Sequence, residues 1–315
     1  MADFVIIPDT SCDLTKELRE RFDIPDYMRG LVYFPDGHSE FSDLDWERHD
    51  PKQFYESMTD KKTIYKTACA PMGEIITVIE KYLSIGKDVL MITLSSALSG
   101  TYQVCEMAKK EMSAKYPERK IICVDSMRYS TALSLLCMLA SEKKKSGATI
   151  EETAQFIEEK KHCIHQMGPM DDLFFLVKTG RISNFKAFFG TLVGINAMAD
   201  FNRKGMSQVL GRFKGKKAAF DALIKYMRQT VENPHEQIMF VAHSNRPEAA
   251  KLLSELIDKE FSPKEIIIND VGMSCGASIG PGLCAAFYYG KEISEDMQAE
   301  IAIMNSIIDS QRVKK

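Results

Sequence analysis

Hydroxyl-bearing residues follow or precede several short apolar segments of this chain. They are Thr10, Ser11, Thr67, Ser95, Ser96 and Ser126. In open parallel sheets, ligands bind beyond the carboxyl ends of the strands, where the first N–H groups of the following helices are unpaired. Hydroxyls beside such helix ends form a neutral, donor-rich site for a small anion, a carboxylate or a phosphate. The same residue types are also ordinary helix caps, and that structural alternative stays open for each of them.

Two nucleotide-binding motifs are absent from the sequence. It contains no G-x-x-x-x-G-K-[ST] loop and no G-x-G-x-x-G fingerprint. His243 ends an apolar segment and is either a base or a structural histidine. The eight cysteines include no C-x-x-C pair, so we expect no metal site. We also expect no cofactor.

Two kinds of element pattern follow one another along the chain. In the first half, apolar segments 4–7, 89–94 and 121–124 alternate with helical patterns at 74–83, 129–145 and 149–162, which predicts an α/β domain with a buried parallel sheet. In the second half, strand patterns at 172–178, 238–243, 264–270 and 283–289 mix with helices at 215–231 and 247–260, which predicts an α+β domain. We therefore predict domains at 1–165 and 166–315, the second with an added C-terminal helix at about 294–312.

Composition narrows the class of protein. The 315 residues carry 41 Lys+Arg and 44 Asp+Glu, and the net charge of −3 argues against a nucleic-acid partner. No stretch of about 18 apolar residues predicts a membrane span, and the N-terminus lacks the pattern of a signal peptide. We expect a cytoplasmic protein with reduced thiols.

Glycine-bearing segments of the second half carry further signals. Residues 177–183 place Arg181 in a turn after the predicted strand, and arginine suits bidentate recognition of an oxyanion. The aromatic stretch 185–195 is typical of a core, and it would equally suit the cover of an apolar cavity. Gly280-Pro281-Gly282 predicts a tight loop where the backbone approaches a neighbour closely.

Six ordered motifs, taken together, resemble the DegV family, which includes the fatty-acid-binding subunits of bacterial fatty-acid kinase. They are Asp9-Thr10-Ser11-Cys12-Asp13-Leu14, Thr67-Ala68-Cys69-Ala70-Pro71-Met72-Gly73-Glu74, Ser95-Ser96-Ala97-Leu98-Ser99-Gly100-Thr101-Tyr102-Gln103, Asp125-Ser126 with Ser130, Thr179-Gly180-Arg181-Ile182-Ser183, and Gly280-Pro281-Gly282. The similarity extends from about Phe4 to Tyr289 and leaves only the C-terminal stretch outside.

This resemblance implies a long-chain fatty acid in an apolar tunnel between the two domains. Its carboxylate would be bound by Thr67, Ser95 and Ser96, with Ser278 at the position of a family histidine. Further contacts to the ligand or a partner would come from Thr10, Ser11, Ser126, Arg181, Gly280 and Gly282, and the tunnel would be covered by Phe185, Phe188, Phe189 and Leu192. The implied protein is not an enzyme. It presents the acid to a separate kinase, which forms an acyl phosphate for phospholipid synthesis, and it contacts the membrane surface transiently.

Three departures from the family pattern bear on the ligand. Of the family's T-S-Q-P-S only Thr67 remains, and Cys69 replaces a polar residue. Ser278 replaces the histidine, and the family's I-K-P-I-L becomes residues 195–199. Two alternatives therefore stay open: a lipid-sensing or carrier protein without a kinase partner, and a hydrolase that uses Ser95 or Ser96 as nucleophile.

Overall fold

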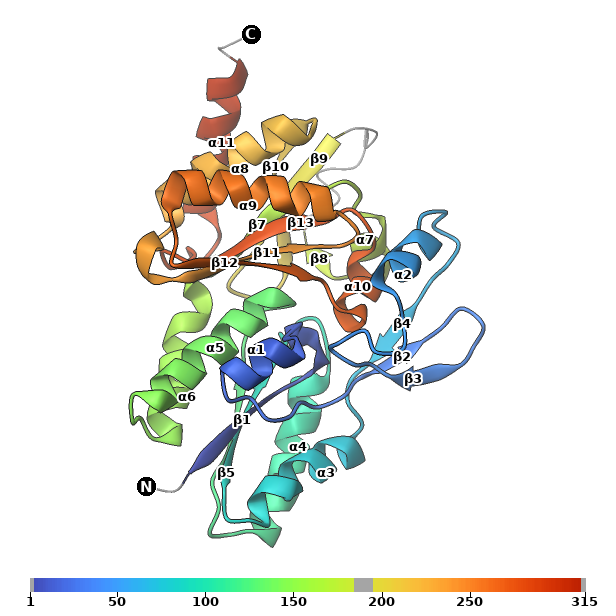
Figure 1. The fold of residues 1–315 in the computed structure, drawn as a ribbon, viewed down its shortest axis with the longest axis vertical. Coiled ribbons are helices and arrows are strands. Elements are labelled where there is room, and N and C mark those ends of the chain that lie inside the picture. Colours follow the sequence, from blue (N-terminus) through green and yellow to red (C-terminus); the bar gives the residue numbers. More distant parts are fainter. Residues whose placement is uncertain (1–2, 184–194, 313–315) are drawn as a thin grey trace. The chain divides into compact units, whose positions relative to one another are not determined.

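The structure is a computed structural model that describes residues 3–183 and 195–312 (Figure 1). Its internal packing divides the chain into two units. Unit 1 contains Met1–Asp50, Lys62–Lys161 and Gly272–Ala277, and unit 2 contains Pro51–Lys61, His162–Val271 and Ser278–Lys315. Where the sequence predicts one boundary near residue 165, the packing also assigns Pro51–Lys61 and Gly272–Ala277 to the unit opposite to their neighbours in the chain.

A three-stranded parallel sheet forms the centre of unit 1. Its order is β1 (Phe4–Pro8), β5 (Asp88–Thr93) and β6 (Ile121–Asp125). Side chains alternate between the two faces of each strand, and Val5, Ile7 and Met91 pack with the helices of one face in a single core. Because both faces are covered, the strands are almost entirely apolar.

Helices flank this sheet on both faces (Figure 1). One face carries α3 (Met72–Leu83) and α4 (Thr101–Lys115), and the other carries α5 (Thr131–Lys145) and α6 (Ile150–Lys160). The unit also contains the 3-10 turn η1 (Thr10–Cys12), α1 (Lys16–Arg21) and α10 (Met273–Ile279), whose last residues belong to unit 2. The predicted α/β domain with a parallel sheet is confirmed.

A second, antiparallel sheet of unit 1 is not predicted from the sequence. Its order is β3 (Ser39–Phe41), β2 (Leu31–Tyr33) and β4 (Lys66–Ala68). Each of these strands has three residues, too few for an alternating pattern to be visible in the sequence.

A seven-stranded mixed sheet organises unit 2. Its order is β12 (Glu265–Asp270), β11 (Ile238–His243), β13 (Cys284–Tyr289), β7 (Ile164–Met170), β9 (Ile195–Phe201), β10 (Ser207–Lys214) and β8 (Ile182–Ser183). The pairs β11–β12 and β10–β8 are parallel and the others are antiparallel. This arrangement confirms the predicted mixed architecture of the second half.

Helices complete unit 2. They are α2 (Pro51–Ser57), α7 (Phe174–Thr179), α8 (Lys216–Thr230), α9 (Pro247–Phe261) and α11 (Gln298–Arg312). The 3-10 turns are η4 (Pro234–Glu236) and η2 (Lys161–Cys163), whose first residue belongs to unit 1. The strand predicted at 172–178 is wrong, because this segment is helix α7. The Asp172 carboxylate accepts the Phe174 N–H at 2.9 Å and thus starts the helix, which buries Phe175 and Leu176.

Candidate functional site in the strand-end turns of unit 1

The turns after β1 and β5 are joined by Asp9. One carboxylate oxygen, Oδ1, accepts the Ser11 N–H at 2.7 Å, and Oδ2 accepts the Leu94 N–H at 2.8 Å. Burial raises the pKa of the Asp9 carboxyl, although these two hydrogen bonds oppose the shift. Because Asp9 is bonded to both turns, Thr10 and Ser11 are fixed relative to the turn that carries Ser95.

The turns after β5 and β6 are joined in the same way. Asp125 Oδ1 accepts the N–H groups of Ser96 and Met127, both at 3.1 Å. The Ser95 N–H donates to the Arg128 carbonyl at 2.9 Å. The Ser95-Ser96 backbone is therefore held by the turn after β6, and both of its N–H groups already have partners there.

Three of the predicted hydroxyls have structural partners. Ser95 Oγ accepts the Ala97 N–H at 3.2 Å, Ser126 Oγ accepts the Arg128 N–H at 3.0 Å, and Thr10 Oγ1 accepts the Gly30 N–H at 3.1 Å. These bonds are capping interactions of the kind that the structural alternative requires. Each hydroxyl still has a lone pair or a proton for a ligand, because Ser and Thr oxygens accept twice and donate once.

Thr67 reaches this region by a route that the sequence does not suggest. It lies in β4 of the antiparallel sheet, paired with Val32, and not at the end of a parallel strand. Gly30 connects it to the first turn, because a Cβ atom there would lie 3.0 Å from the Ala68 carbonyl and 3.3 Å from Thr10 Oγ1. The antiparallel sheet thus brings β4 next to Thr10.

Two buried cations lie beneath the turn after β6. Arg128 is fully buried and donates from Nε to the Lys161 carbonyl at 2.7 Å. Lys161 in turn donates from Nζ to the Asp125 carbonyl at 3.0 Å. Lys161 is also paired with Glu158. The Arg128 charge favours an anion at the turn, whereas the buried carboxylates Asp9 and Asp125 oppose one.

The acids of these turns are functional candidates that the sequence alone does not single out. Asp9, Asp13 and Asp125 are all buried, and each bonds to backbone or hydroxyl groups of the loops. The available signal is an aspartate directly at the end of an apolar strand and followed by hydroxyl residues, as in Asp9-Thr10-Ser11 and Asp125-Ser126.

In the part of the chain that the structure describes, Ser95 Oγ has no hydrogen bond to a side chain that could act as the base of a hydrolase. Within the described residues, the hydrogen bonds of Ser95 Oγ go to the Ala97 N–H and, at 4.0 Å, to the Met127 sulfur. His243 lies in unit 2, where its Nδ1 is 3.2 Å from Asp270 Oδ1. Burial lowers the pKa of His243 and the Asp270 charge opposes this.

The backbone of the Gly280-Pro281-Gly282 loop in unit 2 lies close to neighbouring residues, as the sequence indicates. Gly280 has φ of +72°, and a Cβ atom there would lie 2.2 Å from the ring of Phe175. The Gly282 N–H donates to the Ser244 carbonyl at 2.9 Å, and its carbonyl accepts the Asp171 N–H at 3.2 Å. Ser278, which is 5% exposed, lies in the last turn of α10 just before this loop.

Arg181 follows a helix, not the predicted strand. Gly180, in the left-handed conformation, ends α7, and the Arg181 N–H donates to the Leu176 carbonyl at 2.9 Å. The guanidinium also bonds the Thr179 carbonyl. Both the backbone and the side chain of Arg181 are therefore fixed by carbonyl groups at the C-terminal end of α7. The predicted tunnel cover, Phe185, Phe188, Phe189 and Leu192, lies outside the described residues.

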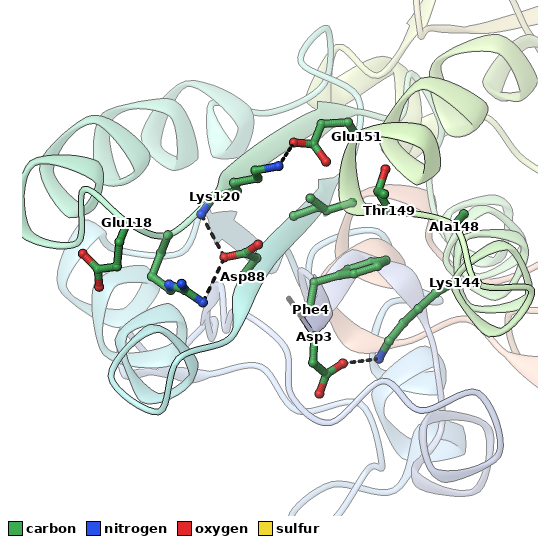
Figure 2. Close-up of a pocket in the computed structure, with 12 residues that line it drawn as sticks. Asp3, Phe4, Asp88, Glu118, Lys120, Lys144, Ala148, Thr149 and Glu151 are labelled. Carbon is green, nitrogen blue, oxygen red and sulfur yellow. Dashed lines mark hydrogen bonds and ion pairs between the residues drawn. The ribbon is translucent and has the colours of Figure 1, made fainter. Parts of the chain in front are cut away.

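A surface pocket of unit 1 lies at the opposite end of the parallel strands (Figure 2). Its volume is about 480 Å³, and it lies beside Asp3, Asp88 and Lys120, at or just before the starts of the strands. Its charged groups pair with one another: Lys120 with Glu151, and Lys144 with Asp3 at 3.8 Å. In the described part of the chain, no group of three or more His, Cys, Asp or Glu side chains is arranged to hold a metal ion, and no helix is long and apolar enough to cross a membrane.

The two-unit α/β fold with hydroxyl-bearing strand-end turns matches a known protein class. Residues 3–291 match the family model described as an uncharacterised protein of the DegV family. The chain belongs to the DegV family, and the resemblance inferred from the motifs is confirmed.

Individual relatives extend this comparison. A DegV domain-containing protein of Clostridium perfringens is 32% identical over 92% of this chain and 98% of its own length. A Thermotoga maritima structure, described as revealing fatty acid binding function, is 25% identical with a TM-score of 0.78, over 92% of this chain and 100% of that one. The Streptococcus pneumoniae Fatty Acid Kinase B3 protein loaded with linoleic acid shares the fold, at 20% identity and a TM-score of 0.77, over 92% and 100% of the two chains.

Proposed function

We propose that this protein binds a long-chain fatty acid in an apolar tunnel and presents the carboxylate to a separate kinase. The observation that carries the proposal is the Ser95–Ser96 turn, which Asp125 and Arg128 hold rigidly in a family with fatty-acid-binding members. In this proposal Thr67, Ser95, Ser96 and Ser278 bind the carboxylate, and Arg181 contacts the head group or the kinase. The domain limits 1–165 and 166–315 and the tunnel position stay predictions.

Burial of the tail accounts for affinity. A sixteen-carbon tail contributes roughly 13 kcal/mol at about 0.8 kcal/mol per CH₂, before the costs of association and ordering. Neutral hydroxyl donors then suffice to orient the head group. A close cationic clamp would lower the nucleophilicity of the carboxylate, and the proposed direct ligands Thr67, Ser95, Ser96 and Ser278 carry no charge.

The proposed reaction takes place in the kinase partner. The carboxylate oxygen forms a bond to the γ-phosphorus of ATP while the bond to the β,γ-bridging oxygen breaks, which yields an acyl phosphate and ADP. This chain supplies no catalytic group. Its role is to bind the acid and orient its carboxylate.

The first test is native mass spectrometry of protein purified from a bacterial host, followed by titration of the delipidated protein with fatty acids. We expect a long-chain fatty acid to co-purify with the protein. The length of its acyl chain would indicate the length of the cavity. Delipidated protein that binds no fatty acid would refute the proposal. Labelling by a serine-reactive phosphonate would instead favour the hydrolase.

A second test separates presentation from binding. Thr67→Ala should abolish acyl phosphate formation with ATP and a cognate kinase while the tail still binds, because Thr67 acts only on the head group. Thr77→Ala is the control, since this exposed hydroxyl donates to the Gly73 carbonyl within α3. If Thr67→Ala loses fatty-acid binding and acyl phosphate formation to the same extent, the proposed head-group role of Thr67 is wrong. Binding with no phosphorylation by wild-type protein would indicate a carrier without a kinase partner.

A further inference from the structure

Asp13 connects three distant parts of unit 1. It follows η1 and is 2% exposed. Its Oδ2 accepts a hydrogen bond from Ser130 Oγ, and its Oδ1 accepts the Gly272 N–H at 3.0 Å, across 259 residues of sequence. One carboxylate therefore holds the start of α5 and the start of α10 against the first strand-end turn.

The contact between Asp13 and Gly272 leaves no room for a side chain. A Cβ atom at position 272 would lie 2.7 Å from Asp13 Oδ1. The next turn of α10 is fixed beside it, since Cys275 Sγ donates to the Ser11 carbonyl at 3.5 Å and Tyr129 Oη donates to the Cys275 carbonyl at 3.0 Å. The helix that leads to Ser278 is thus anchored to the turn that carries Ser11.

The loop from Ser126 to Ser130 is strained, and Asp13 holds its end. Met127 and Ser130 have φ of +51° and +58°, and Asp13 itself has +54°. Such conformations are unfavourable in non-glycine residues and persist only where the surroundings enforce them. Within this loop, the Arg128 carbonyl accepts the Ser95 N–H at 2.9 Å, so the strain is held next to the Ser95–Ser96 turn.

We propose that Asp13 is the positioning residue of the head-group site. It sets the spacing of the turns at Ser11, Ser95 and Ser126 by fixing the Ser130 end of the loop and the start of α10. Asp13 need not touch the ligand, and it acts through Ser130 and Gly272. This inference rests on the proposed function and identifies which group keeps the site assembled.

The test compares two ligands with the same tail on delipidated full-length protein, hexadecanoic acid and hexadecan-1-ol. Asp13→Ala should weaken binding of the acid about tenfold, equivalent to about 1.4 kcal/mol, and leave the alcohol nearly unchanged. Asp13→Asn should retain most of the acid affinity. Its amide oxygen still accepts the Gly272 N–H, and its NH₂ group can donate to Ser130 Oγ.

The outcomes separate the inference from the proposed function. Equal weakening of both ligands by Asp13→Ala, or no change for either, overturns the role of Asp13. If Asp13→Ala does not fold, Ser130→Ala removes one arm alone and should give the same acid-selective loss; an unchanged affinity ratio in Ser130→Ala overturns the inference. Wild-type protein that binds neither ligand refutes the proposed function, and the head-group role with it.

Discussion

His165 and Asp200 form a hydrogen-bonded pair in the interior of unit 2. Nδ1 of His165 lies 2.7 Å from Asp200 Oδ2, and both side chains are almost completely buried. The other ring nitrogen, Nε2, lies 3.0 Å from the Lys291 carbonyl, which only accepts. Asp200 Oδ1 also accepts the N–H groups of Gln166 and Phe201 at 2.9 and 2.7 Å. The pair therefore joins β7, β9 and the segment after β13.

Asp200 should make the stability of the protein sensitive to acid. Burial alone would raise the pKa of the Asp200 carboxyl, but the His165 charge and the hydrogen bonds outweigh burial and hold the pKa below its usual 3.8. A depressed folded-state pKa contributes stability above the unfolded-state value, and this contribution is lost as pH falls through the folded-state pKa. Urea denaturation near pH 7 should give a larger unfolding free energy for the wild-type protein than for Asp200→Asn. This difference should shrink as the pH falls below 3.8.

Exposed acids provide the control for this measurement. Glu260 pairs with Arg228 on the surface, where solvent screens the pair, so Glu260→Gln should change the unfolding free energy little at any pH. A wild-type to Asp200→Asn difference that stays constant from pH 7 to pH 3 would contradict the assignment of an ionised, stabilising Asp200.

Gly280 should tolerate no side chain, for two separable reasons. The left-handed backbone costs a non-glycine residue about 1–2 kcal/mol, and the contact with Phe175 adds about 1–3 kcal/mol of overpacking. Gly180 is the matched control, since its φ is also +72° and a Cβ atom there would meet nothing within 4 Å. Gly280→Ala should therefore lower the thermal midpoint clearly more than Gly180→Ala. Equal effects would show that Phe175 does not pack against this loop.

The sequence predicts the regular elements that have strong periodicity. Eleven elements lie close to their predicted positions: strands β1, β5, β6, β11, β12 and β13, and helices α3, α5, α6, α8 and α9. It does not predict β7, in which Gly168 and Pro169 interrupt the apolar pattern. Gly168 is there because its backbone packs directly against Ala285 of β13, a tertiary contact with no local signal. Strand β9 is obscured similarly by the buried polar residues Asn196 and Asp200.

The candidate site is predictable in part. The turns at Ser95 and Ser126 follow from strand ends, because parallel strands bring their carboxyl ends to one edge. The position of Thr67 depends on an antiparallel sheet of very short strands, and that of α10 depends on a hydrogen bond between Asp13 and Gly272. Neither relationship is encoded in local spacing, since each arises only when distant segments pack together.

Helix α11 should contribute strongly to the stability of unit 2, although it lies beyond the residues matched by the family model. Met304 is fully buried, and a Cβ atom at Gly211 of β10 would lie 2.7 Å from its Cγ. Met304→Ala should lower the unfolding free energy by roughly 2–5 kcal/mol. Met107→Ala, at a side chain that is 58% exposed on α4, is the control and should change it by less than about 0.5 kcal/mol.

The double variant Gly211→Ala/Met304→Ala tests whether the Met304 side chain packs directly against Gly211. Gly211→Ala alone should destabilise by about 1–3 kcal/mol, because the added methyl group overpacks against Met304. In the Met304→Ala background the same methyl group enters the vacated space, so its cost should disappear. Urea denaturation of the four proteins gives the coupling free energy directly. Additive effects would mean that α11 does not rest on β10 through this contact, and that the glycine serves only the irregular pairing between Val209 and Gly211.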